Sequence, residues 1–196
     1  MVHPVWEWMS SQRQRSKLSV PVRLAKKTTD EDSLYLAICA HAERAAEKLR
    51  TGHQFCKRIS VFVSTSPFAE NETFYKNQAS TELAVPTQDT RDIISAAIKA
   101  LYAVFIPGHR YHRAGVMSSD FRSGRVSQLT LFDEFQPHQN SDKLMTLLDS
   151  LNHSGKGKVW LAGQGIYDAA ADWKMRRGRL SPARTTRLSD ILKVRC

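Results

Sequence analysis

The spacing of apolar residues alternates between a helical and a strand period along the first two thirds of the chain. From Leu34 to Leu49 apolar residues recur every three or four positions, which predicts an amphipathic helix. Thr29 or Asp30 stands at the N-cap position in a Thr-x-x-Asp pattern, and Gly52 stands where a C-terminal cap belongs. The chain must therefore pair helices with a sheet.

Strand and helix patterns then follow in turn. Ile59, Val61 and Val63 alternate with Arg58, Ser60, Phe62 and Ser64, which predicts a strand with one face toward a core. A shorter strand is expected near 80–85, and a second helix from Thr87 or Asp89 to Pro107-Gly108. This helix is expected to bury Ile94, Ala97, Ile98, Leu101 and Phe105.

The order of these elements predicts the fold class. An extended segment from 110 to 121 and a weak strand near 20–24 complete the pattern βαββαβ. We expect an α+β fold of the ferredoxin-like split type, with two helices on one face of an antiparallel sheet. The other face of the sheet stays free.

That free face is a candidate nucleic-acid surface. If Ile59, Val61 and Val63 point to the helices, side chains alternating with them point away. The candidate DNA-binding residues are Arg58, Ser60, Ser64, Arg110, His112 and Arg113. Small hydroxyls and arginines suit phosphate contacts, which position a protein without reading bases. The alternative is an ordinary solvated sheet face.

A short apolar peptide, Gln128-Leu129-Thr130-Leu131-Phe132, lies in a polar segment outside any amphipathic pattern. Leu131 and Phe132 can fill an apolar pocket of a partner, Leu129 adds area, and the Gln128 carboxamide can fix the register. The alternative is a short edge strand that packs on its own domain.

This peptide resembles the sliding-clamp-binding motif of bacterial replication and repair polymerases. Its flanks look like the UmuC-like Y-family of translesion DNA polymerases, the catalytic subunits of SOS-induced polymerases. Upstream, the matching segments are 45–50, 65–69, 86–94, 108–111 and 114–117, which look like the little-finger domain; downstream they are 164–166, 173–177, 180–182, 185–187 and 189–190, which look like the C-terminal tail. The resemblance runs from about Thr29 to Arg195.

The resemblance implies a division of the chain. Residues 1–19 match nothing in the family, 20–122 correspond to a little-finger DNA-binding domain, 123–140 to a linker with the clamp-binding motif, and 141–196 to a basic tail. It implies a role in SOS DNA repair and mutagenesis, with template-primer duplex, damaged DNA and the sliding clamp as partners. The tail is associated in the family with a UmuD′-like subunit and the RecA filament.

Catalysis is not expected from this chain alone. A Y-family polymerase carries its metal-binding carboxylates on a palm domain, and only Asp30-Glu31-Asp32 and Asp133-Glu134 are acidic clusters here that could be considered. Neither follows an apolar strand that could aim carboxylates at two metal ions. We therefore expect no catalytic residue, no metal site and no cofactor, since magnesium belongs to the catalytic domain.

Two other functions stay open. The chain can be a subunit or fragment of an active polymerase whose palm is encoded separately. It can also be a ferredoxin-like RNA-binding protein, which needs exposed aromatic residues on the central strands. Only Phe62 is well placed for that role.

The formal charge of +10 is concentrated at the two ends of the chain, with +4 in residues 1–30, −1 in 31–155 and +7 in 156–196. A basic tail suits phosphate binding. The chain has no apolar run that could span a bilayer and no signal-peptide pattern at its start. We therefore expect no membrane partner. Cys39, Cys56 and Cys196 are an odd and widely spaced set, so we expect the protein to reside in a reducing cytoplasm.

Overall fold

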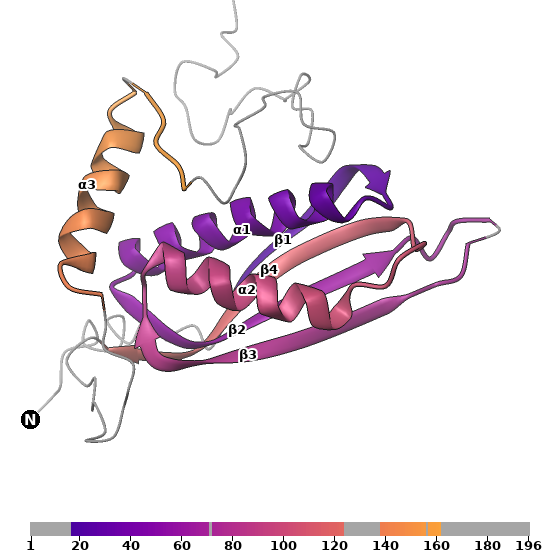
Figure 1. Cartoon of the computed structure of the whole chain (residues 1–196), viewed down its shortest axis with the longest axis horizontal. Helices are drawn as coiled ribbons and strands as arrows, with labels where there is room; N and C mark the ends of the chain where they lie inside the picture. The colour runs from indigo at the N-terminus through magenta and orange to yellow at the C-terminus, as the bar shows by residue number, and fades with distance from the viewer. Residues whose placement is uncertain (1–16, 71, 124–137, 156, 162–196) are drawn as a thin grey trace, which may run out of the picture.

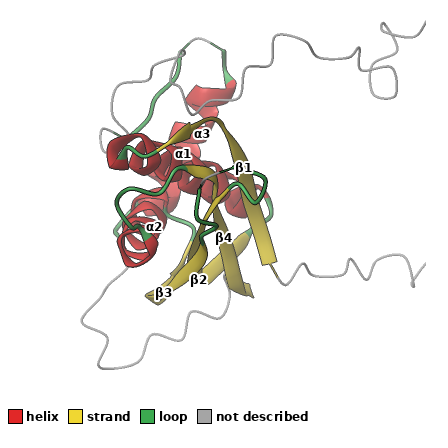
Figure 2. Ribbon diagram, turned by 90° about the vertical axis from the view of Figure 1, so that its right-hand side faces the viewer, coloured by secondary structure: helices red, strands yellow, loops and turns green. Residues whose placement is uncertain are grey.

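The protein forms a two-layer structure in which α1 and α2 cover one face of a four-stranded sheet (Figures 1 and 2). The computed structural model describes residues 17–70, 72–123, 138–155 and 157–161, and only the backbone of 21–23, 25 and 123. The elements are β1 (Lys17–Thr28), α1 (Glu31–Thr51), β2 (Gln54–Thr65), β3 (Lys76–Thr87), α2 (Thr90–Val104), β4 (Tyr111–Ser123) and α3 (Ser141–His153).

The strands lie in the order β1-β4-β2-β3, and every neighbouring pair is antiparallel. Hence β1 and β2 run parallel to each other with β4 between them, and β3 and β4 run parallel with β2 between them. Each helix connects two such parallel strands across the same face of the sheet. The predicted α+β fold, a split βαββαβ arrangement with two helices on an antiparallel sheet, is confirmed.

Of the two N-cap candidates that the sequence offers for each helix, the structure uses the aspartate. The Asp30 carboxylate accepts a hydrogen bond from the Ser33 N–H at 2.8 Å, and the Asp89 carboxylate accepts one from the Arg91 N–H at 2.8 Å. These bonds satisfy backbone donors that have no partner inside the helix. The Gly52 N–H donates to the Lys48 carbonyl and closes α1.

The core lies between the helices and the sheet. Ile59, Val61 and Val63 are fully buried, as their alternation predicts. The helices contribute Leu34, Ala37, Ile38, Ala42, Ala45 and Leu49 from α1 and Ile93, Ala97, Ala100, Leu101 and Val104 from α2. Of the residues expected to be buried on this helix, Ile98 and the C-cap residue Phe105 are only half-buried and pack against the core.

The two edge strands are longer than their sequences suggest. β1 spans twelve residues and includes Pro21, which an edge strand tolerates because one side of its backbone needs no partner. β3 begins at Lys76, four residues before the expected start at Ser80, since Lys76 pairs with Ser64 at the end of β2. Cross-strand pairing, rather than apolar alternation, sets these limits.

The third helix, α3, lies beside the end of the helical layer where α1 finishes (Figure 1). It buries Met145 and Leu148, whereas Leu144, Leu147 and Leu151 are exposed. Among residues 17–70, 72–123, 138–155 and 157–161, no helix is both long and apolar enough to cross a membrane.

Candidate nucleic-acid interface

The face of the sheet opposite the helices carries the cations at its two ends and neutral residues in its middle. Cross-strand pairing sorts this open face into four rows. In the order β1, β4, β2, β3 the rows are Lys17-Ser119-Arg58-Glu82, Ser19-Met117-Ser60-Ser80, Pro21-Gly115-Phe62-Gln78 and Arg23-Arg113-Ser64-Lys76. We call the last of these the basic row. The first and last rows are six residues apart along β2, about 20 Å at the usual rise of a strand.

The basic row lies at the end of the sheet next to the β2–β3 connection. Arg113 and Lys76 are exposed, and Arg23 is paired in register with Arg113. Ser64 lies between Arg113 and Lys76 and is 8% exposed. The guanidinium and ammonium groups, rather than the hydroxyl, are therefore the accessible donors of this row.

Arg58 supplies the cation at the opposite end of the face. Its side chain is 51% exposed, and its guanidinium lies 3.8 Å from the Glu82 carboxylate on β3. The Glu82 carboxylate also receives the Lys57 ammonium at 3.1 Å. Exposed pairs of this kind contribute little energy, so Arg58 can exchange Glu82 for a phosphate at small cost.

The middle of the open face is packed closed. Ser60 is 2% exposed, and its hydroxyl hydrogen-bonds with the Ser80 hydroxyl at 2.8 Å. The Phe62 ring covers Gly115: a methyl group at Gly115 would lie 2.5 Å from the ring and 2.7 Å from the Val20 carbonyl oxygen. Phe62 therefore serves to cover the glycine instead of standing free on a central strand.

The remaining predicted residues lie at the border of this face. Arg110 precedes β4, and its guanidinium donates to Glu72 at 2.9 Å; Glu72 also binds the Lys27 ammonium at 3.0 Å. His112 is half-buried where the β2–β4 register shifts, so it belongs to none of the four rows. The structure thus brings Arg58, Ser60, Ser64 and Arg113 onto one face and leaves the other two at its edge.

Sequence reasoning missed Lys76 and Lys17, which complete the two outer rows on the edge strands. Neither lies in a segment of clear apolar alternation. The available signal was the alternation of polar Gln78, Ser80 and Glu82 with Ala79, Thr81 and Leu83. In the structure Lys76 and the three polar residues are exposed, and the alternate residues are half-buried.

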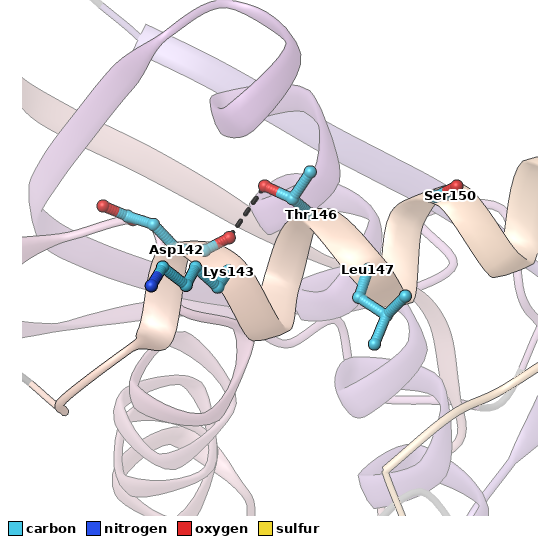
Figure 3. A pocket seen from close by; sticks show the side chains of 5 residues that line it. All are labelled: Asp142, Lys143, Thr146, Leu147 and Ser150. Atoms are coloured by element: carbon cyan, nitrogen blue, oxygen red, sulfur yellow. Dashed lines mark hydrogen bonds between the residues drawn. The ribbon is translucent and has the colours of Figure 1, made fainter.

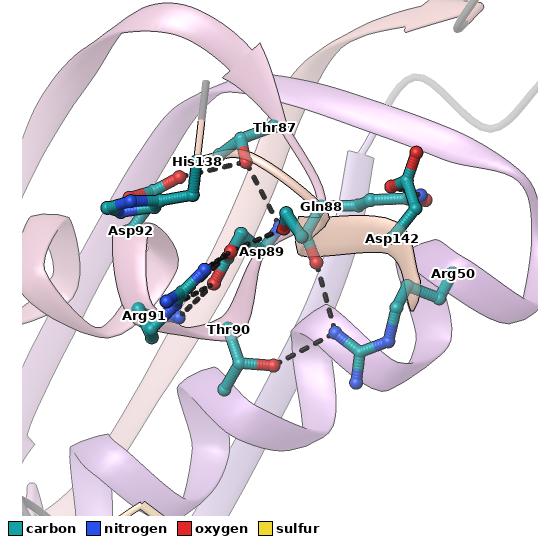
Figure 4. A network of polar contacts seen from close by, with 10 residues as sticks. Arg50, Thr87, Gln88, Asp89, Thr90, Arg91, Asp92, His138 and Asp142 are labelled. Atoms are coloured by element: carbon teal, nitrogen blue, oxygen red, sulfur yellow. Dashed lines mark hydrogen bonds and ion pairs between the residues drawn. The ribbon is translucent and has the colours of Figure 1, made fainter. Parts of the chain in front are cut away.

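A second group of polar residues fixes α3 to the helical layer (Figure 4). The Arg50 guanidinium, at the end of α1, donates to both oxygens of Asp149 at 2.6 and 2.7 Å, to the Gln88 carbonyl at 3.0 Å and to the Thr90 hydroxyl at 2.9 Å. A buried guanidinium in a bidentate pair is a strong and directional contact. Arg50 therefore joins α1, α2 and α3 at one point.

Asp89 supplies the other anchor of α3. Its carboxylate accepts hydrogen bonds from the Arg91 guanidinium and from the Ser141 hydroxyl at the start of α3. Burial alone raises the pKa of Asp89, but the hydrogen bonds from Arg91 and Ser141 and the Arg91 charge outweigh it, so the pKa lies below its ordinary value. Asp89 stays ionised near neutral pH and caps α2 while it holds α3.

The surface of α3 itself is only shallowly hollowed. An open depression is lined by Asp142, Lys143, Thr146, Leu147 and Ser150 (Figure 3). The Thr146 hydroxyl donates to the Asp142 carbonyl at 2.7 Å within the helix. Across the described part of the chain, no group of three or more His, Cys, Asp or Glu side chains is placed to hold a metal ion.

The peptide with Gln128, Leu129, Leu131 and Phe132 lies outside the described residues, as do residues 162–196 of the tail. What the structure places are the two ends of the connection that contains the peptide. These are Ser123, the last residue of β4, and Ser141, the first residue of α3.

Comparison with known proteins decides the family. The model of the impB/mucB/samB family C-terminal domain matches residues 15–131. The chain belongs to this family. A second model, a domain of unknown function, matches residues 142–194, so it begins within the first turn of α3.

Several curated relatives of the impB/mucB/samB family are longer than this chain. Protein SamB of Salmonella typhimurium is 55% identical over 166 residues, which cover 85% of this chain and 38% of that protein. Protein UmuC of the same species is 51% identical over 171 residues, which cover 87% of this chain and 40% of that protein. DNA polymerase IV of Clostridium acetobutylicum is 30% identical over 135 residues, 68% of this chain and 32% of that protein.

Among solved structures, the little finger domain of PolIV in a complex with the beta-clamp processivity factor aligns with 59% of this chain and 98% of that chain, at 15% identity and a TM-score of 0.38. The chain spans about two fifths of the length of SamB and UmuC.

Proposed function

We propose that this chain is the DNA-binding and clamp-binding C-terminal part of a translesion DNA polymerase that acts in SOS repair and mutagenesis. The observation that carries the proposal is the open face, with Arg58 at one end, Arg113 and Lys76 at the other, and a closed neutral surface between them. The kinship to UmuC and to a protein named DNA polymerase IV supports it.

The geometry of the open face suits a duplex held by its phosphates. The outer rows are separated by about 20 Å along the strands, which is enough to place cations on both sides of a major groove about 12 Å wide. The two middle rows contain no ionisable residue, and the exposed residues that they present on β3 are the neutral Ser80 and Gln78. Such a face binds many sequences about equally, because phosphate contacts carry no base information.

The test is a salt titration of duplex binding by the variant Arg58→Ala/Arg113→Ala. We expect affinity for unrelated DNA sequences to fall by similar factors. The slope of log affinity against log salt concentration should become shallower by about two, as expected for two lost phosphate contacts. The matched control is Lys48→Ala/Lys99→Ala, which removes the same charge from exposed positions on α1 and α2. Equal losses in both variants, or an unchanged salt slope, would contradict the proposed face.

Clamp binding is proposed for Gln128, Leu129, Leu131 and Phe132. Leu131→Ala/Phe132→Ala should abolish binding to a bacterial sliding clamp, since each large apolar anchor contributes roughly 1.5 to 3 kcal/mol on burial. Gln128→Ala should cost about 1 kcal/mol. Duplex affinity and melting temperature should stay unchanged. A variant that melts several degrees lower, with no clamp affinity in the wild type, would assign the peptide to its own domain.

A polymerase whose palm is supplied separately is the second candidate function. The length of SamB and UmuC favours it, because this chain aligns with only about two fifths of each. The test is primer extension with magnesium by this chain mixed with separately produced palm, fingers and thumb. A UmuD′-like subunit and the RecA filament remain proposed partners of the tail. RNA binding is less favoured, because Phe62 is occupied over Gly115.

A further inference from the structure

Two phenylalanines of the β2–β3 loop, residues 66–75, are the exposed aromatic side chains closest in sequence to the basic row. Phe68 is 91% exposed and Phe74 is 56% exposed. Figure 1 shows this connection projecting past the end of α2. Removing apolar ring surface from water is favourable, so a ligand that covers both rings gains binding free energy.

The base of the loop is held firmly although its aromatic residues are exposed. The Thr65 N–H donates to the Tyr75 carbonyl at 2.9 Å, and the Tyr75 N–H donates to the Thr65 hydroxyl at 2.8 Å. The Tyr75 hydroxyl donates to the Val104 carbonyl at 2.8 Å, and its ring stacks on His109 with centroids 4.8 Å apart. The loop therefore starts and ends at positions fixed against α2 and the β4 side.

Two exposed cations, Lys76 and Arg113, lie in the row of the sheet from which this loop leaves. Ser64 and Lys76, the last paired residues before the loop, belong to the basic row together with Arg113. Within the loop, Glu72 is neutralised by Lys27 and Arg110. Glu70 is exposed and is the residual negative charge of the loop.

We propose that Phe68 and Phe74 form a stacking site for unpaired nucleobases of single-stranded DNA that continues from a duplex on the open face. Aromatic rings beside cations that track a phosphate backbone are the recurring composition of single-strand sites. A base inside a duplex has both faces covered by its neighbours, whereas each unpaired base of an overhang has a free face that the exposed rings can cover. The inference rests on the proposed function, which brings duplex DNA to the basic row.

The experiment compares three DNA ligands by fluorescence anisotropy: a blunt duplex, the same duplex with a single-stranded overhang, and the single strand alone. For the wild type we expect the overhang to raise affinity about tenfold over the blunt duplex. Phe68→Ala/Phe74→Ala should lose this gain and keep the blunt-duplex affinity. A 2-aminopurine in the overhang should be quenched by the wild type and not by this variant.

The matched control is Tyr102→Ala/Ile106→Ala. It removes two apolar side chains that are also exposed, at 57% and 43%, at the end of α2 and just beyond it. This control should keep both the overhang preference and the quenching. Melting curves of all variants establish that they fold. Glu70→Gln should strengthen binding of the overhang ligand by a few fold, because it removes the residual carboxylate of the loop.

The outcomes separate this inference from the proposed function. If the wild type binds blunt duplex through Arg58 and Arg113 but gains nothing from an overhang, the stacking site is wrong and the duplex function stands. If Phe68 and Phe74 are needed for single strands while duplex binding is not detectable, the stacking site stands and the duplex function is wrong. Unchanged overhang binding in Phe68→Ala/Phe74→Ala overturns the stacking site and leaves the two rings as a surface for a protein partner.

Discussion

The two faces of the sheet are made from alternate residues of the same strands, and they differ in how deeply their side chains are buried. On the helix-covered face, Ile59, Val61 and Val63 are fully buried in the core. On the open face, exposed Arg58 and buried Ser60 are neighbours on the same strand. Substitutions on the covered face should therefore change the stability of the fold, whereas those in the outer rows of the open face should change binding.

The comparison also separates two ways of holding an element in place. The body of the fold is held by apolar contacts between the helices and the sheet. The third helix buries only Met145 and Leu148 and adds polar contacts, with Arg50 bound to Asp149 and Asp89 bound to Ser141. Apolar contact is non-directional, whereas a bidentate ion pair fixes one rotation of the helix. In the orientation that these polar contacts hold, α3 leaves Leu144, Leu147 and Leu151 exposed.

The largest expected effect comes from the covered face. Ile59→Ala should lower the free energy of unfolding by about 2 to 5 kcal/mol, because it removes buried methyl groups and leaves a cavity. Duplex affinity, measured per folded molecule, should be unchanged. Chemical denaturation with parallel DNA titration checks both values. A loss of DNA affinity in a fully folded Ile59→Ala sample would break the separation between the two faces.

The next effect is a pH dependence of the helical layer. Burial, and then the nearby Arg44 charge, lower the pKa of His41 on α1 to about 4. The unfolded state therefore binds a proton more readily than the folded state. The free energy of unfolding is therefore not reduced by protonation of His41 above about pH 6.5. It falls by about 2 to 3 kcal/mol as the pH falls toward 4.

Denaturation curves between pH 7 and pH 4 measure this loss, and His41→Gln should flatten it. Asp89 acts in a different window, because its pKa is below its ordinary value. Its contribution is present above the unfolded pKa of an aspartate and is lost only as the pH falls further. An equally steep loss between pH 6.5 and 4 in His41→Gln would rule out His41 as the cause.

A smaller loss of stability is expected in the middle of the open face. Gly115→Ala should destabilise the fold by about 1 to 3 kcal/mol, because the new methyl group would meet the Phe62 ring and the Val20 carbonyl oxygen. The ring can move, but the carbonyl belongs to the β1 backbone. Thermal melting measures the change. If the double variant Gly115→Ala/Phe62→Ala regains the lost stability, the Phe62 ring alone, and not the Val20 carbonyl, clashes with the new methyl group.

The smallest effect should come from Ser60→Ala. Ser60 is buried and its hydroxyl is bonded to Ser80, so the substitution should cost about 1 kcal/mol of stability and change duplex affinity less than twofold. An affinity loss as large as that of Arg58→Ala would return Ser60 to the set of phosphate-binding residues. Comparison of this variant with Arg58→Ala thus shows whether duplex affinity depends on the outer rows or on the middle rows of the open face.

Local sequence signals were sufficient for the helices and the central strand. Asp30 and Asp89, each one of two candidates from the sequence, cap the helices, and Ile59, Val61 and Val63 face the core. These features depend on residues close together in the chain. The cations of the candidate site were only partly found: Arg58 and Arg113 share the open face as expected, but Lys76 was missed because it reaches the basic row through pairing with β2.

The sequence by itself determined the order of the elements, the approximate ends of α1 and α2 and the face that β2 buries, because periodicity and capping are local properties. Only the tertiary structure decided the strand order, the length of the edge strands, the burial of Ser60 and Ser64 and the rotation of α3. These features depend on register and on contacts such as Arg50 with Asp149, 99 residues apart in the chain. Local periodicity cannot encode such pairings, since many partners would satisfy the same pattern and only the packed fold selects one.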